Sequence, residues 1–303
     1  MKKTILIVGC TSFLGFNLLS KLANIKKFKI ICTYRKNKKF FTNFKNVSFI
    51  KLDLSKKKEI SKIKKLKPNY IFFLVSSDFQ KSNNLDYHIS QNLLNSFNFF
   101  SDINYSKLEK VIFSSSGAVY GSGRRLSEKS KIKNEFNYGF IKYLTEKMIL
   151  FFSKKNGFDV VIFRIFSLYG RFDYNKRFFV DAIRSFLNKK KFIIKTKNQE
   201  RDYLFVDDAV NAFIKALEFK GSDIFNLASG KSVMTFNIAN KIKNLIKDKK
   251  KLKIIYKIDK KQNIIPHYTA KVDYVEKKLN WKAEVKLGDG IKKVYEWIKY
   301  EKY

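Results

Sequence analysis

A tyrosine and a lysine four residues apart are the side chains of this 303-residue chain that could most directly do chemistry. They are Tyr138 and Lys142, and on a helix this spacing brings both side chains to one face, one turn apart. A cation beside a phenol favours the phenolate and lowers the tyrosine pKa from its ordinary value of about 10. Ser116, upstream at the end of a serine run, could hydrogen-bond an alcohol or ketone oxygen at the same point. The three residues predict proton exchange with such an oxygen, although a chain rich in Tyr and Lys also produces the spacing by chance.

These side chains need a scaffold, and apolar runs alternate with helical spacing along the first half of the chain. The apolar runs predict strands at 5–8, 29–33, 47–52, 70–75, 111–114 and 160–165. Helical spacing predicts helices between them, among others at 13–22, 85–100 and 138–152. Alternation of this kind indicates a parallel sheet with helices on both faces. After about residue 165 the order is less regular, so we expect a smaller second lobe to begin there.

A glycine-containing turn follows the first predicted strand. It runs from Gly9 to Gly15 with the spacing Gly-x-x-Gly-x-x-Gly, except that Ser12 takes the middle place. Glycines at such a turn let the backbone approach a pyrophosphate, which then lies on the N-terminus of the helix that Phe13 and Leu14 begin. The Ser12 hydroxyl is expected to donate to a phosphate. The turn therefore predicts a dinucleotide site, and the alternative is two glycines in an ordinary tight turn.

The end of the second predicted strand bears on the choice of dinucleotide. An acidic residue there accepts a hydrogen bond from the ribose 2′-hydroxyl of NAD. This chain has Arg35 and Lys36 instead, and these cations suit the additional phosphate of NADP. We therefore expect NADP(H) in preference to NAD(H). The alternative is that both residues are ordinary surface cations.

The net charge of the chain is +38, from 64 basic and 26 acidic residues. Clustered positive charge would predict nucleic-acid binding, but only eight of the basic residues are Arg and the lysines are spread over the whole length. We interpret most lysines as solvated surface and expect no specific nucleic-acid partner, with weak and non-specific RNA binding at most. The two cysteines lack metal-ligand spacing, and no apolar run approaches the roughly 18 residues of a membrane span. Hence we expect no metal, no membrane insertion and a cytoplasmic protein.

With these motifs the chain resembles one known family nearly end to end: the extended short-chain dehydrogenase/reductases that modify nucleotide sugars, also called NAD-dependent epimerase/dehydratases. The turn at 9–15 matches the family's dinucleotide turn with one substitution. Residues 111–121 resemble its active-site strand, and Tyr138 and Lys142 with Glu146 resemble its catalytic helix. Further segments that match in order are Asp53-Leu54, Leu74-Val75-Ser76, Asn92, 164–170, Arg201-Asp202-Tyr203, Val206-Asp207-Asp208 and the tail from Pro266 to Gly290.

The resemblance implies an α/β fold: a Rossmann-type, doubly wound parallel sheet in an NAD(P)-binding domain at 1–165. It implies a smaller substrate-binding lobe in 166–303, with some segments returning to the first domain. The implied catalytic residues are Ser116, Tyr138 and Lys142. Cofactor contacts are implied for Gly9, Ser12, Phe13, Leu14, Gly15, Arg35, Asp53, Leu54, Leu74, Val75, Ser76, Tyr138 and Lys142, and substrate contacts for Ser116, Ser167, Arg201 and Tyr268. The implied substrate is a nucleotide-diphosphate sugar, and the implied assembly is a homodimer through the helices at 85–100 and 138–152.

Departures from the family pattern narrow the expected reaction. The family's 4,6-dehydratases place an Asp-Glu pair directly after the catalytic Thr, where this chain has Gly117 and Ala118. Dehydration is therefore disfavoured, and hydride and proton exchange at one sugar carbon, typically C4, remains. Because no acid follows the second strand, we expect a 4-ketoreductase, and a 4-epimerase with tightly bound NAD is the alternative. Lys261 stands about where epimerases carry a second phosphate-binding arginine.

A rival of another class is a non-catalytic relative that binds RNA or senses a cofactor. Some such relatives have lost the catalytic Tyr and Lys, whereas this chain keeps Ser116, Tyr138 and Lys142 together. A purely structural interpretation, in which the serine run ends a strand and Tyr138 packs in a core, requires all three to coincide by chance. The sequence therefore favours an enzyme.

Overall fold

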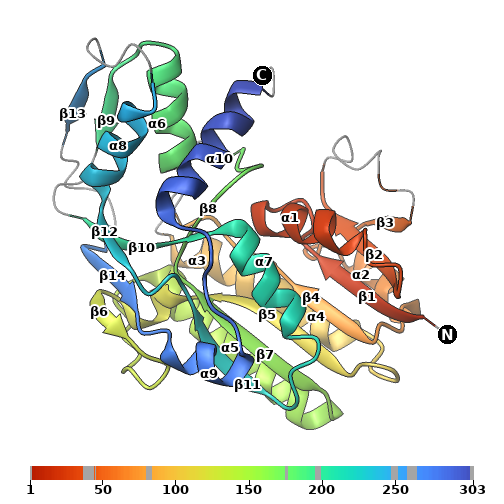
Figure 1. The fold of residues 1–303 in the computed structure, drawn as a ribbon. Coiled ribbons are helices and arrows are strands. Elements are labelled where there is room, and N and C mark those ends of the chain that lie inside the picture. Colours follow the sequence, from red (N-terminus) through yellow and green to blue (C-terminus); the bar gives the residue numbers. More distant parts are fainter. Residues whose placement is uncertain are drawn as a thin grey trace. The chain divides into compact units, whose positions relative to one another are not determined.

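The computed structural model describes residues 2–36, 44, 46–79, 84–174, 177–194, 199–246, 252–257 and 265–300 (Figure 1). Lys261 lies outside the described residues. The chain forms two compact units. The first comprises Met1–Gly121, Lys131–Ile165 and Val210–Asn226, and the second comprises Ser122–Ser130, Phe166–Ala209 and Leu227–Tyr303. That one domain binds the cofactor and the other the substrate stays a prediction.

A seven-stranded sheet, in the order β11-β7-β5-β4-β1-β2-β3, forms the centre of the first unit (Figure 1). Its strands are β1 (Lys3–Val8), β2 (Phe28–Tyr34), β3 (Val47–Lys51), β4 (Tyr70–Phe73), β5 (Lys110–Ser116), β7 (Asp159–Ile165) and β11 (Asp223–Leu227). Neighbours from β3 to β7 in this order pair in parallel. β4, β5 and β7 are almost wholly buried, with apolar residues at their centres, as expected for a sheet covered on both faces. The predicted parallel sheet is confirmed.

Adjacent phenylalanines of β4 show that both faces of this sheet are covered. The helices around the sheet are α1 (Phe13–Leu22), α2 (Lys57–Ile60), α3 (Leu85–His88), α4 (Asn95–Asp102), α5 (Asn137–Asn156) and α7 (Val206–Lys215), with the turns η2 (Ser61–Lys65), η3 (Ile89–Leu94) and η4 (Gly117–Tyr120). Phe72 packs against Phe213 of α7, and Phe73 packs against Phe100 of α4, with ring centroids 6.2 and 5.0 Å apart. Successive side chains of a strand point to opposite faces, so α7 and α4 cover opposite sides. The doubly wound fold is therefore confirmed.

The helix predicted at 85–100 is interrupted. It consists of α3, the π-helical turn η3 and α4 in direct succession. Periodicity of apolar residues does not distinguish a π-turn from the α-helix around it. The difference matters because η3 lies beside the candidate active site described below.

The second unit contains smaller sheets and a core of its own. Its strands are β6 (Gly123–Leu126), β8 (Ser167–Tyr169), β9 (Phe192–Ile194), β10 (Glu200–Phe205), β12 (Ser232–Met234), β13 (Ile254–Tyr256) and β14 (His267–Ala270), and its helices are α6 (Phe178–Leu187), α8 (Thr235–Asn244), α9 (Asp273–Leu279) and α10 (Leu287–Tyr300). One sheet has the order β12-β10-β14-β6, with β8 beside β10, and β9 pairs with β13. Aromatic residues dominate the core, where Tyr169 stacks on Phe179 with ring centroids 4.2 Å apart. This unit therefore has a hydrophobic core independent of the large sheet.

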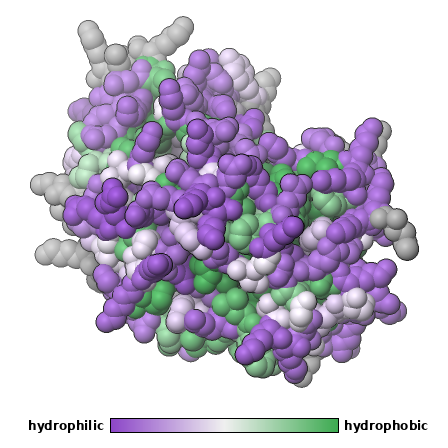
Figure 2. Space-filling model, turned by 60° about the horizontal axis from the view of Figure 1, so that its bottom comes forward, coloured by the Kyte–Doolittle hydropathy of each residue, from purple (hydrophilic) through white to green (hydrophobic). Residues whose placement is uncertain are grey.

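The surface is strongly hydrophilic, with smaller apolar patches between the polar side chains on the face that Figure 2 shows. Within the described ranges, no helix is long and apolar enough to cross a membrane. The same part of the chain holds no group of three or more His, Cys, Asp or Glu side chains that could bind a metal ion.

Candidate active site

The turn between β1 and α1 packs so tightly that two of its positions require glycine. Gly9 has φ = +90°, and a Cβ atom there would lie 3.3 Å from the backbone carbonyl of Leu74. A Cβ atom on Gly15 would collide with the carbonyl oxygen of Gly9. Ser12 caps α1, because its Oγ accepts a hydrogen bond from the Gly15 N–H at 3.0 Å. Glycine is therefore required at both ends of this turn. The N–H groups at the start of α1, from Phe13 onward, follow from the same turn.

Lys142 is buried and held by backbone carbonyl groups. Its Nζ donates to the carbonyl oxygens of Ser114 at 2.7 Å and Val75 at 3.2 Å, and it lies 4.6 Å from the centroid of the Phe113 ring. Burial lowers the pKa of Lys142 to about 7, while the charge of Glu146 acts in the opposite direction. The side chain expected to act as an ammonium group is therefore only partly protonated near neutral pH.

Tyr138 lies one turn before Lys142 on α5, as the spacing predicts. Its Oη is 3.1 Å from Ser76 Oγ. The phenol ring meets the rings of Phe79 and His88 edge-on, with centroids 5.5 and 5.6 Å away. Ser76 follows Val75, so a single segment after β4 contacts two of the three predicted catalytic side chains, Tyr138 and Lys142.

Ser116 is the last residue of β5, and its Oγ accepts a hydrogen bond from the Ala118 N–H at 3.2 Å. Gly139 lets α5 approach the η4 turn that follows. A Cβ atom on Gly139 would collide with the carbonyl oxygen of Ala118 and lie 3.2 Å from the backbone nitrogen of Val119. The turn after Ser116 and the start of the helix that carries Tyr138 therefore pack backbone against backbone.

A buried ion pair joins β7 to α5 near these residues. Arg164 Nη2 is 2.7 Å from Glu146 Oε2, and the two side chains are 5% and 1% exposed. Arg164 also donates to the hydroxyl of Tyr120 at 2.9 Å, and that hydroxyl donates to Asn226 Oδ1 at 2.8 Å. Ser115 donates its hydroxyl proton to Glu146. The network ties together the ends of β5, β7 and β11 and the middle of α5.

Three of the predicted cofactor residues, Arg35, Asp53 and Leu54, lie just after the ends of β2 and β3. Asp53 Oδ1 accepts hydrogen bonds from the Ser55 hydroxyl at 2.7 Å and its N–H at 3.1 Å. Burial raises the pKa of Asp53, but the hydrogen bonds from Ser55 and the charge of Arg35 outweigh it, so the pKa lies below its ordinary value. Leu54 is buried, and the exposed Arg35 donates to Gln91 Oε1 at 3.2 Å.

The predicted cofactor and catalytic residues therefore gather at one edge of the large sheet. They follow the carboxyl ends of β1, β2, β3, β4 and β5, which are neighbours in the sheet. In open α/β sheets, ligands bind outside the carboxyl ends of the strands. The residues brought to this edge are Gly9, Ser12, Phe13, Leu14, Gly15, Arg35, Asp53, Leu54, Leu74, Val75, Ser76 and Ser116.

The remaining predicted substrate residues lie together in the second unit. Arg201 of β10 is directly opposite Tyr268 of β14, and its guanidinium carbon is 5.7 Å from the centroid of the Tyr268 ring. Arg201 Nη1 also donates to Ser167 Oγ of β8 at 3.4 Å. A cation, an aromatic ring and a hydroxyl group thus share one place on three adjacent strands.

Two hydrogen-bonded side chains near Tyr138, of which His88 contacts its ring, were not among the predicted site residues. They are Ser77, which follows the predicted Ser76, and His88, at the end of α3. The available signal was a second serine after the strand and a histidine four residues before Asn92 on a helical segment. Both are also common in ordinary cores, so the sequence alone did not single them out.

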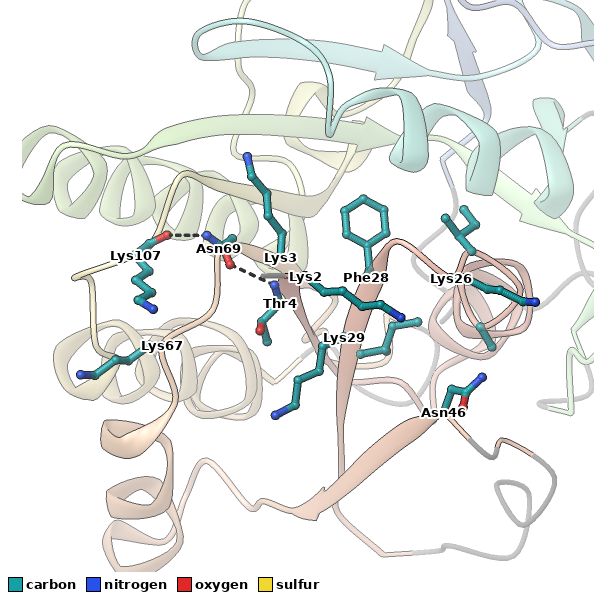
Figure 3. A pocket seen from close by; sticks show the side chains of 13 residues that line it. Lys2, Lys3, Thr4, Lys26, Phe28, Lys29, Asn46, Lys67, Asn69 and Lys107 are labelled. Carbon is teal, nitrogen blue, oxygen red and sulfur yellow. Dashed lines mark hydrogen bonds between the residues drawn. The ribbon is translucent and has the colours of Figure 1, made fainter.

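A separate hollow of about 700 Å³ opens at the opposite edge of the large sheet (Figure 3). The lysines that line it are Lys2, Lys3, Lys26, Lys29, Lys67 and Lys107. Asn69 crosses it, accepting from the Thr4 N–H at 2.9 Å and donating to the carbonyl oxygen of Lys107 at 3.4 Å. Because these residues lie around the amino ends of β1, β2 and β4, the hollow is not part of the candidate active site.

Known proteins share the sequence pattern and the fold of this chain. Residues 5–228 match the NAD dependent epimerase/dehydratase family. A dTDP-4-dehydro-6-deoxyglucose reductase of Escherichia coli is 31% identical over 240 residues, which cover 73% of this chain and 71% of the reductase. A putative UDP-glucose 4-epimerase of Methanocaldococcus jannaschii is 28% identical over 228 residues, 69% of each chain.

Among solved structures, a UDP-glucuronic acid 4-epimerase from Bacillus cereus, in complex with UDP-glucuronic acid and NAD, has the same fold. Its TM-score is 0.88 at 20% identity, with 98% of this chain and 99% of the epimerase covered. The doubly wound sheet, the glycine turn and the family match over residues 5–228 define the class of protein. This chain belongs to the NAD-dependent epimerase/dehydratase family, as the sequence predicts.

Proposed function

We propose that this protein is an NAD(P)-dependent nucleotide-sugar oxidoreductase that exchanges a hydride and a proton at C4 of the sugar, as a 4-ketoreductase. The observation that carries the proposal is the contact of one segment with both catalytic candidates. Val75 accepts a hydrogen bond from Lys142, and Ser76 is hydrogen-bonded to Tyr138. This segment follows β4, the neighbour of β1 and of β5 in the sheet. Family membership and the reductase relative from Escherichia coli support the same class.

Tyr138 is the proposed proton donor and Ser116 its partner. During reduction the Tyr138 hydroxyl gives its proton to the ketone oxygen, while the Ser116 hydroxyl donates a hydrogen bond to the same oxygen. A bound nicotinamide supplies the hydride to the carbon. Lys142 in its protonated form lowers the pKa of Tyr138 and holds the nicotinamide ribose. General acid–base assistance of this kind contributes about 10² to 10⁴ in rate.

The β1–α1 turn requires glycine at Gly9 and Gly15 and leads into the N-terminus of α1, the arrangement that binds a pyrophosphate in dinucleotide sites. Arg35 and Lys36, at the end of β2, favour the additional phosphate of NADP, and we propose NADP(H) as the preferred cofactor. The NAD in the similarly folded Bacillus cereus epimerase and the family's description support NAD as the alternative. Measuring the dissociation constants of NADPH and NADH decides between them.

Arg201 is the proposed ligand of the substrate's diphosphate group. A guanidinium group matches the geometry of phosphate oxygens and keeps its charge at all relevant pH values. Tyr268 and Ser167 contact Arg201 and are proposed to help bind the nucleotide-diphosphate sugar.

A 4-epimerase is the second candidate, favoured by the putative epimerase relative from Methanocaldococcus jannaschii. Incubating the purified protein with NADPH and a panel of 4-keto nucleotide sugars separates the two activities. A reductase consumes NADPH steadily, and the absorbance of the reduced nicotinamide falls. In a parallel assay on nucleotide sugars with a C4 hydroxyl group, an epimerase interconverts the 4-epimers without net consumption of cofactor, and that result would overturn the reductase assignment.

We also propose a homodimer formed through η3, α4 and α5. Three large apolar side chains on these elements are exposed: Leu94 at 51%, Phe97 at 50% and Phe151 at 63%. The rings of Phe97 and Phe151 both contact the ring of the buried Phe152, with centroids 6.2 and 5.8 Å away, so they belong to one apolar area. Its burial against a second copy would remove this surface from water.

A further inference from the structure

His88 is a buried titratable side chain that the proposed proton transfer does not use. It is the last residue of α3 and is 1% exposed. Its Nδ1 is 2.7 Å from Ser77 Oγ. The imidazole ring also lies edge-on to the phenol of Tyr138, with centroids 5.6 Å apart. One side chain thus contacts both the proposed proton donor and the segment beside it.

Asn92 fixes the direction of the hydrogen bonds at Ser77. Its Oδ1 accepts from the Ser77 N–H at 2.9 Å, so its Nδ2 is the atom that lies 2.6 Å from Ser77 Oγ. Because an amide nitrogen only donates, Asn92 uses one acceptor site of Ser77 Oγ and leaves the hydroxyl proton available for Nδ1 of His88. The geometry points to Nδ1 as the acceptor, which makes His88 a neutral imidazole with its proton on Nε2.

The helix is distorted where these side chains converge. The π-helical turn η3 begins directly after His88 and contains Asn92. Both side chains reach Ser77, which lies on the segment after β4. π-turns within helices are rare and occur frequently at functional sites. The distortion therefore coincides with the hydrogen-bond network around Ser77.

The segment that His88 and Asn92 hold is also the one that contacts the catalytic candidates. Ser76 Oγ donates to the Ser77 carbonyl oxygen at 3.1 Å and lies 3.1 Å from Tyr138 Oη. Tyr138 is thus contacted at its hydroxyl by Ser76 and at its ring by His88. Loss of the His88–Ser77 hydrogen bond would loosen the segment that holds the phenol hydroxyl.

We propose that His88 is a positioning residue for proton transfer by Tyr138. As a neutral imidazole it anchors Ser77 and supports the phenol ring, so that the Tyr138 hydroxyl stays at Ser76. The consequence for catalysis rests on the proposed function, whereas the protonation state of His88 does not.

Two substitutions separate the hydrogen bond from ring packing. His88→Phe keeps a ring against Tyr138 but removes the acceptor for Ser77, and His88→Asn restores an acceptor. His88→Phe is expected to lower kcat by up to about 10²-fold, the cost of a misplaced reacting group, with KM and NADPH affinity little changed. His88→Asn is expected to recover part of that loss. Unchanged kcat in His88→Phe, or a loss confined to KM, would overturn the proposal.

Ser96→Ala is the matched control. Ser96 is buried on α4, and its hydroxyl has no hydrogen-bond partner among the residues that the structure describes. The variant tests whether any change at a buried polar residue of this helical segment lowers kcat, and wild-type kcat is expected. A loss equal to that of His88→Phe would reduce the role of His88 to general packing.

Ring-nitrogen NMR of the isotope-labelled protein tests the protonation state without turnover. The chain has two histidines, and His267→Gln identifies the signals of His88. The neutral form with the proton on Nε2 is expected at neutral pH. A proton on Nδ1, in either the other tautomer or the imidazolium form, would overturn the inference. Should the wild type show no nucleotide-sugar activity, the proposed function fails while this test still stands.

Discussion

Lys142 combines a proposed role that needs its charge with surroundings that disfavour the charge. Its Nζ has carbonyl oxygens of Ser114 and Val75 as acceptors, but burial lowers its pKa to about 7. The carbonyl groups satisfy the donors of the side chain and only partly replace water around the charge. The charged form of Lys142 is destabilised in the free protein, and a bound anionic ligand would stabilise it.

Substitution of Lys142 by methionine is expected to reveal this cost as a pH-dependent stability. In the folded state the pKa is about 7, against 10.5 for an unperturbed lysine, so between these values the unfolded chain binds more protons. The free energy of unfolding of the wild type, relative to Lys142→Met, therefore rises with pH across that window. Below pH about 7 the variant is expected to be more stable by a few kcal/mol, and the difference shrinks towards pH about 10.

Urea unfolding of both proteins across this pH range measures the difference. Lys147→Met, at an exposed position of the same helix, is the control and is expected to follow the wild-type profile. A stability difference between wild type and Lys142→Met that stays constant with pH contradicts the assigned burial of the charge.

The sequence identifies residues at this scale when their type and spacing suffice for the chemistry. Ser116, Tyr138 and Lys142 could be found in this way. In the structure, Tyr138 and Lys142 of α5 both contact the segment that follows β4. The role of His88 could not be found, because it depends on the rotation of Asn92 and on a π-turn. The lowered pKa of Lys142 also escapes the sequence, since burial arises from the packed ends of several strands.

At the scale of elements, the contact between α5 and the η4 turn determines where Tyr138 lies. Gly139→Ala would place a methyl group against the Ala118 carbonyl oxygen, which is backbone and cannot turn away. Overpacking of this kind typically costs about 1 to 3 kcal/mol, and here it also displaces the helix that carries Tyr138. Lower stability and lower kcat are expected together, from thermal unfolding and steady-state assays.

Gly288→Ala is the matched control. Gly288 is also helical, on α10, and nothing lies within 4 Å of a Cβ atom built there. Alanine has the higher helix propensity, so this variant is expected to be as stable as the wild type or up to about 1 kcal/mol more stable. Equal effects of the two substitutions on stability and kcat would mean that the contact between α5 and η4 does not determine where Tyr138 lies.

Elements are predictable where burial imposes a simple pattern. The central strands of the large sheet are buried on both faces and therefore contain continuous apolar runs such as Ile5 to Val8. The helix predicted at 85–100 is interrupted at η3, where the hydrogen bonds to Ser77 also lie, and apolar spacing records neither feature. The three strands that bring Ser167, Arg201 and Tyr268 together could be predicted only from the family resemblance.

At the scale of the whole molecule, surface composition bears on assembly. Polar side chains cover most of the face that Figure 2 shows. Leu94, Phe97 and Phe151 are among the large apolar side chains that are nevertheless exposed. Phe151→Lys adds a charge at the centre of the proposed interface. Light scattering is expected to give the mass of a dimer for the wild type and of a monomer for this variant. A monomeric wild type, or a variant that stays dimeric, contradicts this interface.

The central claim is that Tyr138 transfers the proton to the sugar oxygen. The most direct test compares turnover of a 4-keto nucleotide sugar by the wild type, Tyr138→Phe and Tyr143→Phe, a control on the same helix. Tyr138→Phe is expected to lose about 10² to 10⁴ in kcat while NADPH affinity and thermal stability stay close to wild type. Tyr143→Phe is expected to keep its activity. Wild-type turnover by Tyr138→Phe on a substrate that the wild type reduces would contradict the account.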